Sequence, residues 1–148
     1  MRYFVIRYFL SDLDKLTKKS KDNYHTVRKD ICDEFNTVEI PEEVIEKGKI
    51  IRQIKDEGMH FVVKTRIKNT AMKAGKSGGF RLINVVIQHG DRTTFLKVFP
   101  KKGKYGIDDI PDKLLEELLE EYKEALKNDT LIEVDIDNEL AIINNDDE

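Results

Sequence analysis

The segment 75–81, with the sequence GKSGGFR, combines residue types that could handle a phosphate group. Its three glycines favour a backbone with positive φ that can approach a ligand closely, while Lys76 and Arg81 supply positive charge. The aliphatic run that follows, LINVVI at residues 82–87, is typical of a strand covered on both faces. Arg81 is therefore predicted at the mouth of a central strand, in a phosphate-handling corner.

Two other interpretations fit parts of the same segment. The letters GKS match the end of the nucleotide-binding P-loop pattern, but Thr70 stands where that pattern requires its first glycine. A strand also follows where the P-loop requires a helix, so this interpretation is rejected. The second interpretation, a hairpin loop whose lysines serve only solubility, stays open.

Charge is distributed very unevenly along the chain. Residues 1–60 are balanced, whereas residues 61–104 hold 11 lysines and arginines against Asp91 alone. Residues 105–148 hold 16 acidic residues against 3 basic ones. A basic tract of this density with interspersed aromatic side chains predicts a surface for a polyanion, most simply nucleic acid. A solvated lysine face is the alternative.

The composition indicates a single globular domain. A chain of 148 residues can bury its own hydrophobic core. No apolar run approaches the roughly 20 residues that span a bilayer, and the first residues are too charged for a signal peptide, so a cytoplasmic protein with no membrane partner is expected. Cys32 is the only cysteine, which excludes an internal disulfide. Its neighbours at helical spacing, Val27, Ile31 and Phe35, favour a core position over a nucleophilic role.

Apolar periodicity predicts the elements of the N-terminal third. Residues 3–9 are expected to form an opening strand, Ser11 to cap a first helix, and residues 24–35 to form a second helix. The two helices would make a helical hairpin. Pro41 is expected to open a short helical turn that ends at Gly48.

The hydrophobic period then changes to that of strands. Strands are predicted at residues 50–54, 59–68, 80–88 and 93–99, an amphipathic helix at 112–127, and a last strand at 131–136 that could pair with 140–143. Alternation in the 59–68 strand places Phe61, Val63, Thr65 and Ile67 on one face and Val62, Lys64, Arg66 and Lys68 on the other. We therefore expect one sheet face to be apolar and covered by helices, and the opposite face to carry a basic row.

The candidate chemistry is that of phosphate groups. His25, His60 and His89 show none of the spacings of a metal motif, and acidic residues are almost absent from the basic tract, so no metal or other cofactor is expected. Arginine and lysine side chains on strands can stabilise the charge that develops on a phosphate during transfer. RNA supplies its own nucleophile, the 2′-hydroxyl, so a site that cleaves it needs few other groups.

Four blocks of the chain together resemble the RelE toxin family of type II toxin–antitoxin systems (RelE/ParE superfamily), particularly its HigB-like branch. The blocks are FVVKTRI at 61–67, GKSGGFR at 75–81, FLKVFPK at 95–101, and an amphipathic helix that ends in LIEV at 131–134. The resemblance covers a domain of residues 1–134, is most specific over 61–101, and leaves residues 135–148 as an acidic C-terminal extension. It implies an α+β fold with a small, mainly antiparallel twisted sheet, an N-terminal helical hairpin packed on one face, and a C-terminal helix.

The same resemblance implies a function and partners. A family member of this kind is a toxin that cleaves messenger RNA on the ribosome without a metal ion. The 2′-hydroxyl attacks the neighbouring phosphate and a cyclic phosphate results. A cognate antitoxin protein inhibits the toxin, so the expected partners are this antitoxin, the ribosome and mRNA.

Catalytic roles carried over from the resemblance fall on Arg66, Arg81 and Lys101. Arg81 would stabilise the transition-state charge, Arg66 would bind the neighbouring phosphate, and Lys101 would bind phosphate or relay a proton. RNA binding is expected from the surrounding basic and aromatic side chains, namely Lys64, Lys68, Lys73, Lys76, Lys97, Phe99, Lys102, Lys104 and Tyr105. Phe99 stands where several relatives have a tyrosine, so it could stack on a base but could not exchange a proton.

Other functions stay open at the level of the sequence. One is a non-catalytic toxin of the same fold, as the ParE-like gyrase inhibitors illustrate, and another is a plain RNA-binding protein. The acidic residues 135–148 add the hypothesis that this tail shields the basic face and competes with RNA. The alternative is that the tail only aids solubility.

Overall fold

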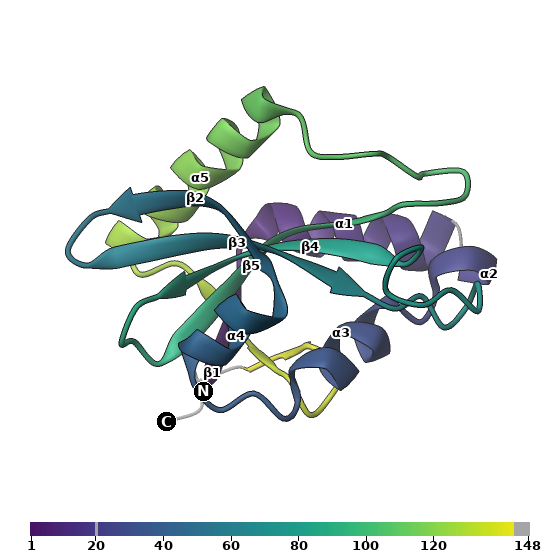
Figure 1. Ribbon diagram of the computed structural model, residues 1–148, viewed down its shortest axis with the longest axis horizontal. Helices are drawn as coiled ribbons and strands as arrows, with labels where there is room; N and C mark the ends of the chain where they lie inside the picture. The colour runs from purple at the N-terminus through teal and green to yellow at the C-terminus, as the bar shows by residue number, and fades with distance from the viewer. Residues whose placement is uncertain (20, 144–148) are drawn as a thin grey trace.

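A single seven-stranded sheet organises the computed structural model, which describes residues 1–19 and 21–143 (Figure 1). The strands are β1 (Arg2–Val5), β2 (Lys49–Lys55), β3 (Met59–Ile67), β4 (Phe80–Ile87), β5 (Arg92–Pro100), β6 (Ile132–Asp135) and β7 (Ala141–Ile142), in the spatial order β2-β3-β4-β5-β1-β6-β7. Strand β1 is parallel to β5 and the other neighbouring pairs are antiparallel. The predicted α+β class with a mainly antiparallel sheet is confirmed, and the sheet is larger than expected.

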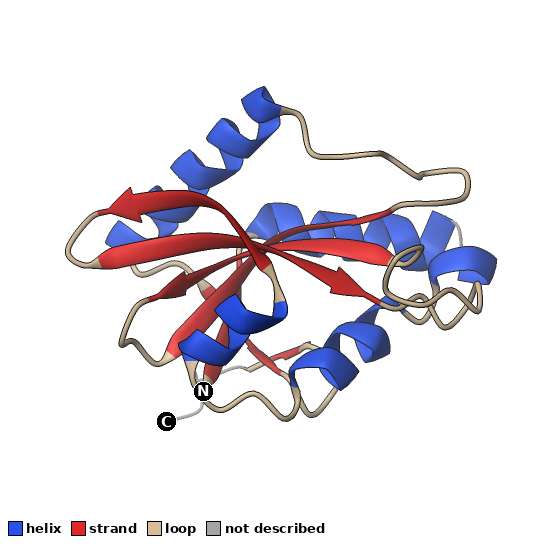
Figure 2. Cartoon of the chain, viewed as in Figure 1, coloured by secondary structure: helices blue, strands red, loops and turns tan. Residues whose placement is uncertain are grey.

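Helices lie on both faces of the sheet. They are α1 (Arg7–Lys19), α2 (Lys21–Tyr24), α3 (Val27–Phe35), α4 (Pro41–Lys47) and α5 (Asp112–Lys127). Helices α3 and α4 pack against one face, α5 lies over the other, and α1 lies beside β5 (Figures 1 and 2). The basic row that was expected on the face opposite α3 and α4 is present at one end of the sheet only, because α5 covers the other end of that face. Over the described residues, none of the helices has the length and apolar character that crossing a membrane requires.

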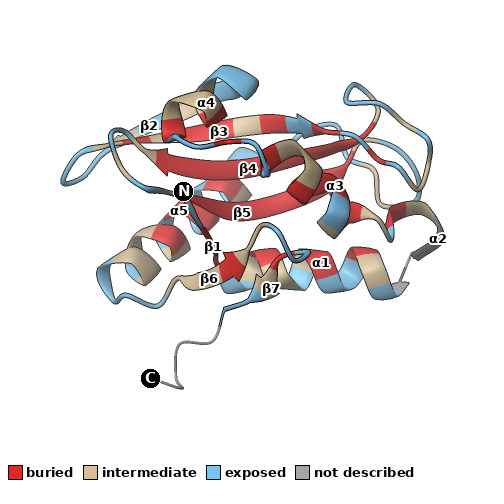
Figure 3. Ribbon diagram, turned by 90° about the horizontal axis from the view of Figure 1, so that it is seen from below, coloured by how far each residue is buried: buried red, intermediate tan, exposed pale blue. Residues whose placement is uncertain are grey.

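Alternation along β3 determines what each face carries. Val63 and Ile67 are buried on the face of α3 and α4. On the opposite face the burial changes along the strand. His60 and Val62 are buried, Lys64 is half-buried and Arg66 is exposed. The four buried residues of α5 cover the apolar end of this face, namely Leu115, Leu118, Leu119 and Tyr122. The basic residues begin where that cover ends, and the central strands are buried along most of their length (Figure 3).

The first helix begins earlier than the sequence predicted. Strand β1 ends at Val5 and α1 begins at Arg7, so residues 7–9 of the predicted strand are helical. Ser11 lies inside α1, with its hydroxyl 3.5 Å from the Arg7 carbonyl, and does not cap it. The reason is that Phe9, Leu13 and Leu16 form a buried stripe at helical spacing. The second predicted helix is likewise divided into α2 and α3.

Polar contacts hold α1 against the open edge of β5. Strand β1 pairs with β5 only as far as Phe95, so the following part of β5 has no strand partner on that side. The Val98 backbone N–H donates instead to the Asp12 carboxylate at 3.1 Å, and the Lys97 ammonium lies 3.3 Å from the same carboxylate. Burial raises the pKa of Asp12 to about 6, although Lys97 and the Val98 N–H oppose the shift.

The Asp12 carboxyl group should make the fold less stable at neutral pH than at mildly acidic pH. The folded-state pKa of Asp12 lies above its ordinary value of 3.8, so the native state binds the proton more tightly than the unfolded state. The stabilising contribution is therefore complete at low pH and is lost as the pH rises through about 6. Between about pH 7 and about pH 5 the wild type should gain about 1 kcal/mol relative to Asp12→Asn. Urea unfolding of both proteins measures the difference, and an equal pH dependence of the two would contradict the prediction.

Residues 135–143 belong to the sheet. Strand β6 pairs with β1, β7 pairs with β6, and Leu140 is buried in the core. The acidic extension predicted from residue 135 thus includes β7 and a buried leucine, which complete the edge of the fold. Strands β1 and β5 lie between β6 and β4, so residues 135–143 do not shield the basic residues of β3 and β4. The rest of the proposed shielding tail, residues 144–148, lies outside the described residues.

Candidate nucleic-acid interface

Two strand arginines lie side by side at one end of the sheet. Arg66 of β3 and Arg81 of β4 are cross-strand partners, so their side chains leave the same face, and Phe99 of β5 continues this row. The next row towards α5 holds Lys64, Ile83 and Lys97. Residues directly opposed in an antiparallel sheet have Cβ atoms about 5 Å apart. The structure thus brings the two arginines together on a rigid support.

The loop before β4 holds Arg81 in place. The Arg81 side chain is 7% exposed, and its Nη1 donates to the carbonyls of Lys76 and Phe80 at 2.9 and 3.3 Å. Its Nη2 donates to the Ser77 carbonyl at 3.0 Å. Because a guanidinium has five N–H donors, these contacts leave two of them without a partner among the described residues. The 75–81 segment thus fixes the orientation of Arg81 through its carbonyl groups.

The electrostatic surroundings of Arg81 favour an anion. Burial lowers the pKa of Arg81, the charge of Arg66 lowers it further, and Asp109 acts in the opposite direction. Arg66 is exposed and, among the described residues, makes no hydrogen bond or ion pair. Two guanidinium groups that disfavour each other's charge are stabilised by an anion bound to both.

The connection between β5 and α5 runs back over this face (Figure 1), and its residues bond to two further lysines, Lys64 and Lys101. The Lys101 Nζ donates to the Asp108 carbonyl at 2.6 Å, and the Lys64 Nζ lies 3.3 Å from both carboxylate oxygens of Asp109. Asp109 also interacts electrostatically with Lys101 and with Arg81. We call Lys64, Arg66, Arg81 and Lys101 the basic cluster.

A buried tyrosine holds the loop of residues 101–106 that follows β5, which we call the corner. The Tyr24 hydroxyl donates to the Lys102 carbonyl at 2.7 Å and accepts the Tyr105 backbone N–H at 3.2 Å. Gly103 packs so closely that a Cβ there would overlap the Tyr24 hydroxyl, and its φ of 87° is in the left-handed region. The exposed Lys102 and Lys104 are therefore carried on an ordered loop beside the basic cluster.

Four of the predicted RNA-binding residues lie on the corner after β5 or on the neighbouring loop before β4. Lys102 and Lys104 are exposed, and Lys73 is exposed on the turn before β4. Tyr105 is half-buried, with the ammonium groups of Lys15 and Lys104 at 4.7 and 5.7 Å from its ring centroid. Its ring is thus already covered by cations, which favours phosphate contacts over base stacking at this corner.

Two predicted RNA-binding lysines point to the opposite side of the sheet. The Lys68 Nζ donates to Asp33 at 3.0 Å and the Lys76 Nζ to Glu34 at 3.0 Å, and both acids belong to α3. Lys68 was expected beside Arg66, but β3 ends at Ile67 and the alternation does not continue. Both lysines are therefore engaged by α3 in this structure, and their contact with RNA stays a prediction.

Two further predicted RNA contacts are buried. Phe99 is 2% exposed, so its ring is closed to a base, and Lys97 is 8% exposed and paired with Asp12. Sequence patterns place both residues on the correct face but do not show that α1 and the loop after β5 cover them. We therefore leave Lys97 and Phe99 out of the interface.

The residue that sequence reasoning missed is Asp109. Its position depends on the path of the connection between β5 and α5, which no periodic pattern describes. The one signal in the sequence is the pair Asp108 and Asp109, which directly follows the basic tract. Among the described residues, no three His, Cys, Asp or Glu side chains gather closely enough to hold a metal ion.

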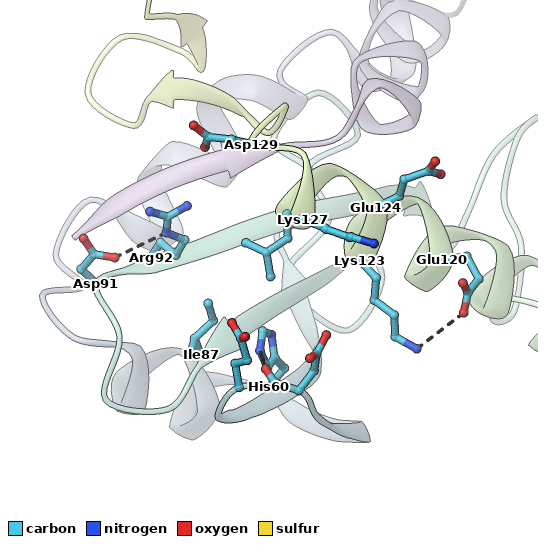
Figure 4. A pocket seen from close by; sticks show the side chains of 12 residues that line it. His60, Ile87, Asp91, Arg92, Glu120, Lys123, Glu124, Lys127 and Asp129 are labelled. Atoms are coloured by element: carbon cyan, nitrogen blue, oxygen red, sulfur yellow. Dashed lines mark hydrogen bonds and ion pairs between the residues drawn. The ribbon is translucent and has the colours of Figure 1, made fainter.

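A separate groove of about 1100 Å³ lies at the other end of the sheet, between α5 and the turns that follow β2 and β4 (Figure 4). His60 lines it, and its Nε2 must carry the proton because it bonds to the Asp56 carbonyl at 2.9 Å. The Nδ1 shares a hydrogen bond of 2.9 Å with the Tyr122 hydroxyl. Both ring nitrogens are occupied, so we assign His60 a structural role.

Cys32 is a structural residue as well. It is 8% exposed among core side chains, and burial raises the pKa of its thiol to about 11. A thiol of this kind is a poor nucleophile near neutral pH, because the thiolate is the reactive form. The core position predicted for Cys32 is confirmed.

Comparison with models of known protein families, with curated proteins and with solved structures finds no match to this chain. Its function must therefore be argued from the geometry of the basic cluster and from the residues that support it.

Proposed function

We propose that this chain is a metal-independent endoribonuclease, a toxin of the RelE type and of its HigB-like branch, which cleaves mRNA on the ribosome. The observation that carries the proposal is the pairing of Arg66 with Arg81 on one rigid sheet face. Arg81 is oriented by three carbonyls, and Arg66 is exposed beside it. A phosphodiester fits two such groups because each guanidinium offers parallel N–H donors to its oxygens.

The reaction would be a transesterification within the RNA. The 2′-hydroxyl oxygen forms a bond to the adjacent phosphorus and loses its proton, while the bond to the 5′-oxygen breaks and that oxygen gains a proton. The products are a 2′,3′-cyclic phosphate and a 5′-hydroxyl. Negative charge builds up on the two non-bridging oxygens in the transition state, and donors fixed beforehand stabilise it best.

Three residues of the basic cluster have a role in the reaction itself, and Lys64 contributes to RNA binding. Arg81 directs its two remaining N–H donors at the scissile phosphate, and Arg66 binds the neighbouring phosphate. Lys101 exchanges its bond to the Asp108 carbonyl for one to phosphate or relays a proton. The ordered corner with Lys102 and Lys104 binds phosphates further along the strand, and this binding weakens with salt because each contact releases counterions.

The proposal extends to the fold assignment and the partners. We infer that α1 and α3 together correspond to the N-terminal helical hairpin of the RelE type. We also infer that a cognate antitoxin neutralises the chain in the cytoplasm, where ribosomes and mRNA are present. The basic cluster would be a favourable place for an acidic antitoxin segment, because it exposes positive charge on an ordered support.

Mapping of message ends tests the proposal directly. The protein is incubated with ribosomes that translate a defined message, and the 3′ ends are sequenced after a treatment that captures cyclic phosphates. We expect new 3′ termini with cyclic phosphates inside codons, in the presence of translating ribosomes and not on free message. Intact message in the presence of ribosome-bound protein would refute the endonuclease.

Non-catalytic RNA binding is the second candidate, and one observation favours it. Asp109 is paired with Lys64, and Lys101 donates to a carbonyl, so neither group is ready to accept a proton in this structure. Phe99 also lacks the hydroxyl that a tyrosine would provide. Ribosome or RNA binding without new message ends would support this function.

A further inference from the structure

Asp109 places a carboxylate inside the basic cluster. Both of its oxygens lie 3.3 Å from the Lys64 Nζ, and one of them also accepts the Ile110 backbone N–H at 2.8 Å. Burial opposes ionisation of Asp109, but the Ile110 N–H, Lys64 and Lys101 outweigh it and lower its pKa. The carboxylate is therefore ionised near neutral pH and is held by the cations that the proposed function assigns to RNA.

The loop that carries Asp109 is anchored on both sides of this residue. Before it, the Ile107 N–H donates to the Pro100 carbonyl at 3.0 Å, and the Lys101 Nζ holds the Asp108 carbonyl. After it, Ile110 is buried at 8% exposure, directly before α5. These anchors fix the position of Asp109 without needing the ion pair to Lys64. The carboxylate thus reaches the cluster because the backbone brings it there.

We propose that the Asp109 carboxylate occupies the place of a phosphodiester group, in an anion subsite formed by Lys64, Arg81 and Lys101. A carboxylate and a phosphodiester each carry one negative charge shared by two oxygens, so the same donors fit both. RNA fills the subsite after it displaces Asp109. The identification of the anion as RNA rests on the proposed function, whereas the competition between Asp109 and an anion does not.

The contact is suited to displacement. The side chain of Asp109 is 58% exposed and that of Lys64 is 22% exposed, so water can enter as the pair separates. Exposed ion pairs of this kind are weak, and charge-assisted bonds from arginine to phosphate are stronger. An RNA strand bound through several phosphates can therefore displace one carboxylate. The strength of the contact that Asp109 makes determines how much affinity for RNA is lost to this displacement.

A matched pair of substitutions tests the proposal. Asp109→Asn removes the charge but keeps the side-chain oxygen that accepts the Ile110 N–H. Asp108→Asn removes the same charge one residue away and keeps the carbonyl that binds Lys101. The probe is a short fluorescent 2′-O-methyl RNA, which lacks the nucleophile and cannot be cleaved. We expect D109N to bind it about two- to fivefold more tightly than D108N at low salt, with the ratio approaching one as salt is added.

A Lys64→Gln background provides the second arm of the experiment. The advantage of D109N over D108N should fall in this background, because a residue that competes through Lys64 couples to it in a double-mutant cycle. Circular dichroism and the thermal midpoint check that each variant folds. Equal affinities of D109N and D108N at low salt would overturn the proposal. Because binding is measured without cleavage, this result would be distinct from a failure of the endonuclease assay.

Discussion

Arg66→Gln is expected to slow message cleavage by about a hundredfold and to leave the stability of the fold unchanged. The loss follows because Arg66 supplies positive charge beside Arg81 and, in the proposal, binds the phosphate next to the one on which charge develops. Stability should not change because Arg66 is exposed and, within the described residues, has no bonded partner to lose. Cleavage rates on translating ribosomes and the thermal midpoint of the purified variant measure the two effects.

Arg81→Gln should give a different result, and the contrast makes the test specific. Arg81 donates to three carbonyls, one buried and two part-buried, so its removal leaves these acceptors without their partner and should cost about 1 kcal/mol of stability or more. Cleavage should fall at least as far as in Arg66→Gln, for structural and electrostatic reasons together. Wild-type cleavage by a folded Arg66→Gln protein would remove the basis for placing the reaction at the basic cluster.

Local periodicity in the sequence predicted the two arginines on one side of the sheet, and their direct cross-strand pairing is a finding of the structure. Basic residues alternate with other side chains over residues 63–67, and an antiparallel neighbour joined by one loop presents its own alternate residues on the same face. Arg66 and Arg81 follow from these two facts. The short helix at Pro41 was also predicted correctly, because proline at the first helical position and glycine after the last are local signals.

Long-range packing decided the features that the sequence did not predict. The buried stripe of α1 includes Phe9, and it converted the end of the predicted first strand into helix. The cover of α5 over His60 and Val62 depends on how a loop without periodicity crosses the sheet. The same crossing places Asp109 beside Lys64, and the burial of Phe99 is visible only once the fold is known.

The glycines of the 75–81 segment matter for a different reason from the one that the sequence suggested. Positive φ was expected at these glycines, but in the described residues the glycines with positive φ are Gly58 and Gly103. Gly79 is required by close approach instead. A Cβ at Gly79 would overlap the Ile67 carbonyl oxygen, whereas a Cβ at Gly75 would have nothing within 4 Å.

Gly79→Ala should therefore destabilise the fold by about 3 kcal/mol, because a main-chain atom must move to make room for the new methyl group. The Gly79 carbonyl accepts the Lys101 N–H at 3.0 Å, and Arg81 lies two residues further on, so the shift should also displace the basic cluster and lower RNA binding. Gly75→Ala is the matched control in the same segment and should change stability by less than about 0.5 kcal/mol. Urea unfolding of the three proteins gives the free energies, and binding of the 2′-O-methyl RNA reports on the cluster. Equal stability of the two alanine variants would show that the segment is not held by the contact between Gly79 and Ile67.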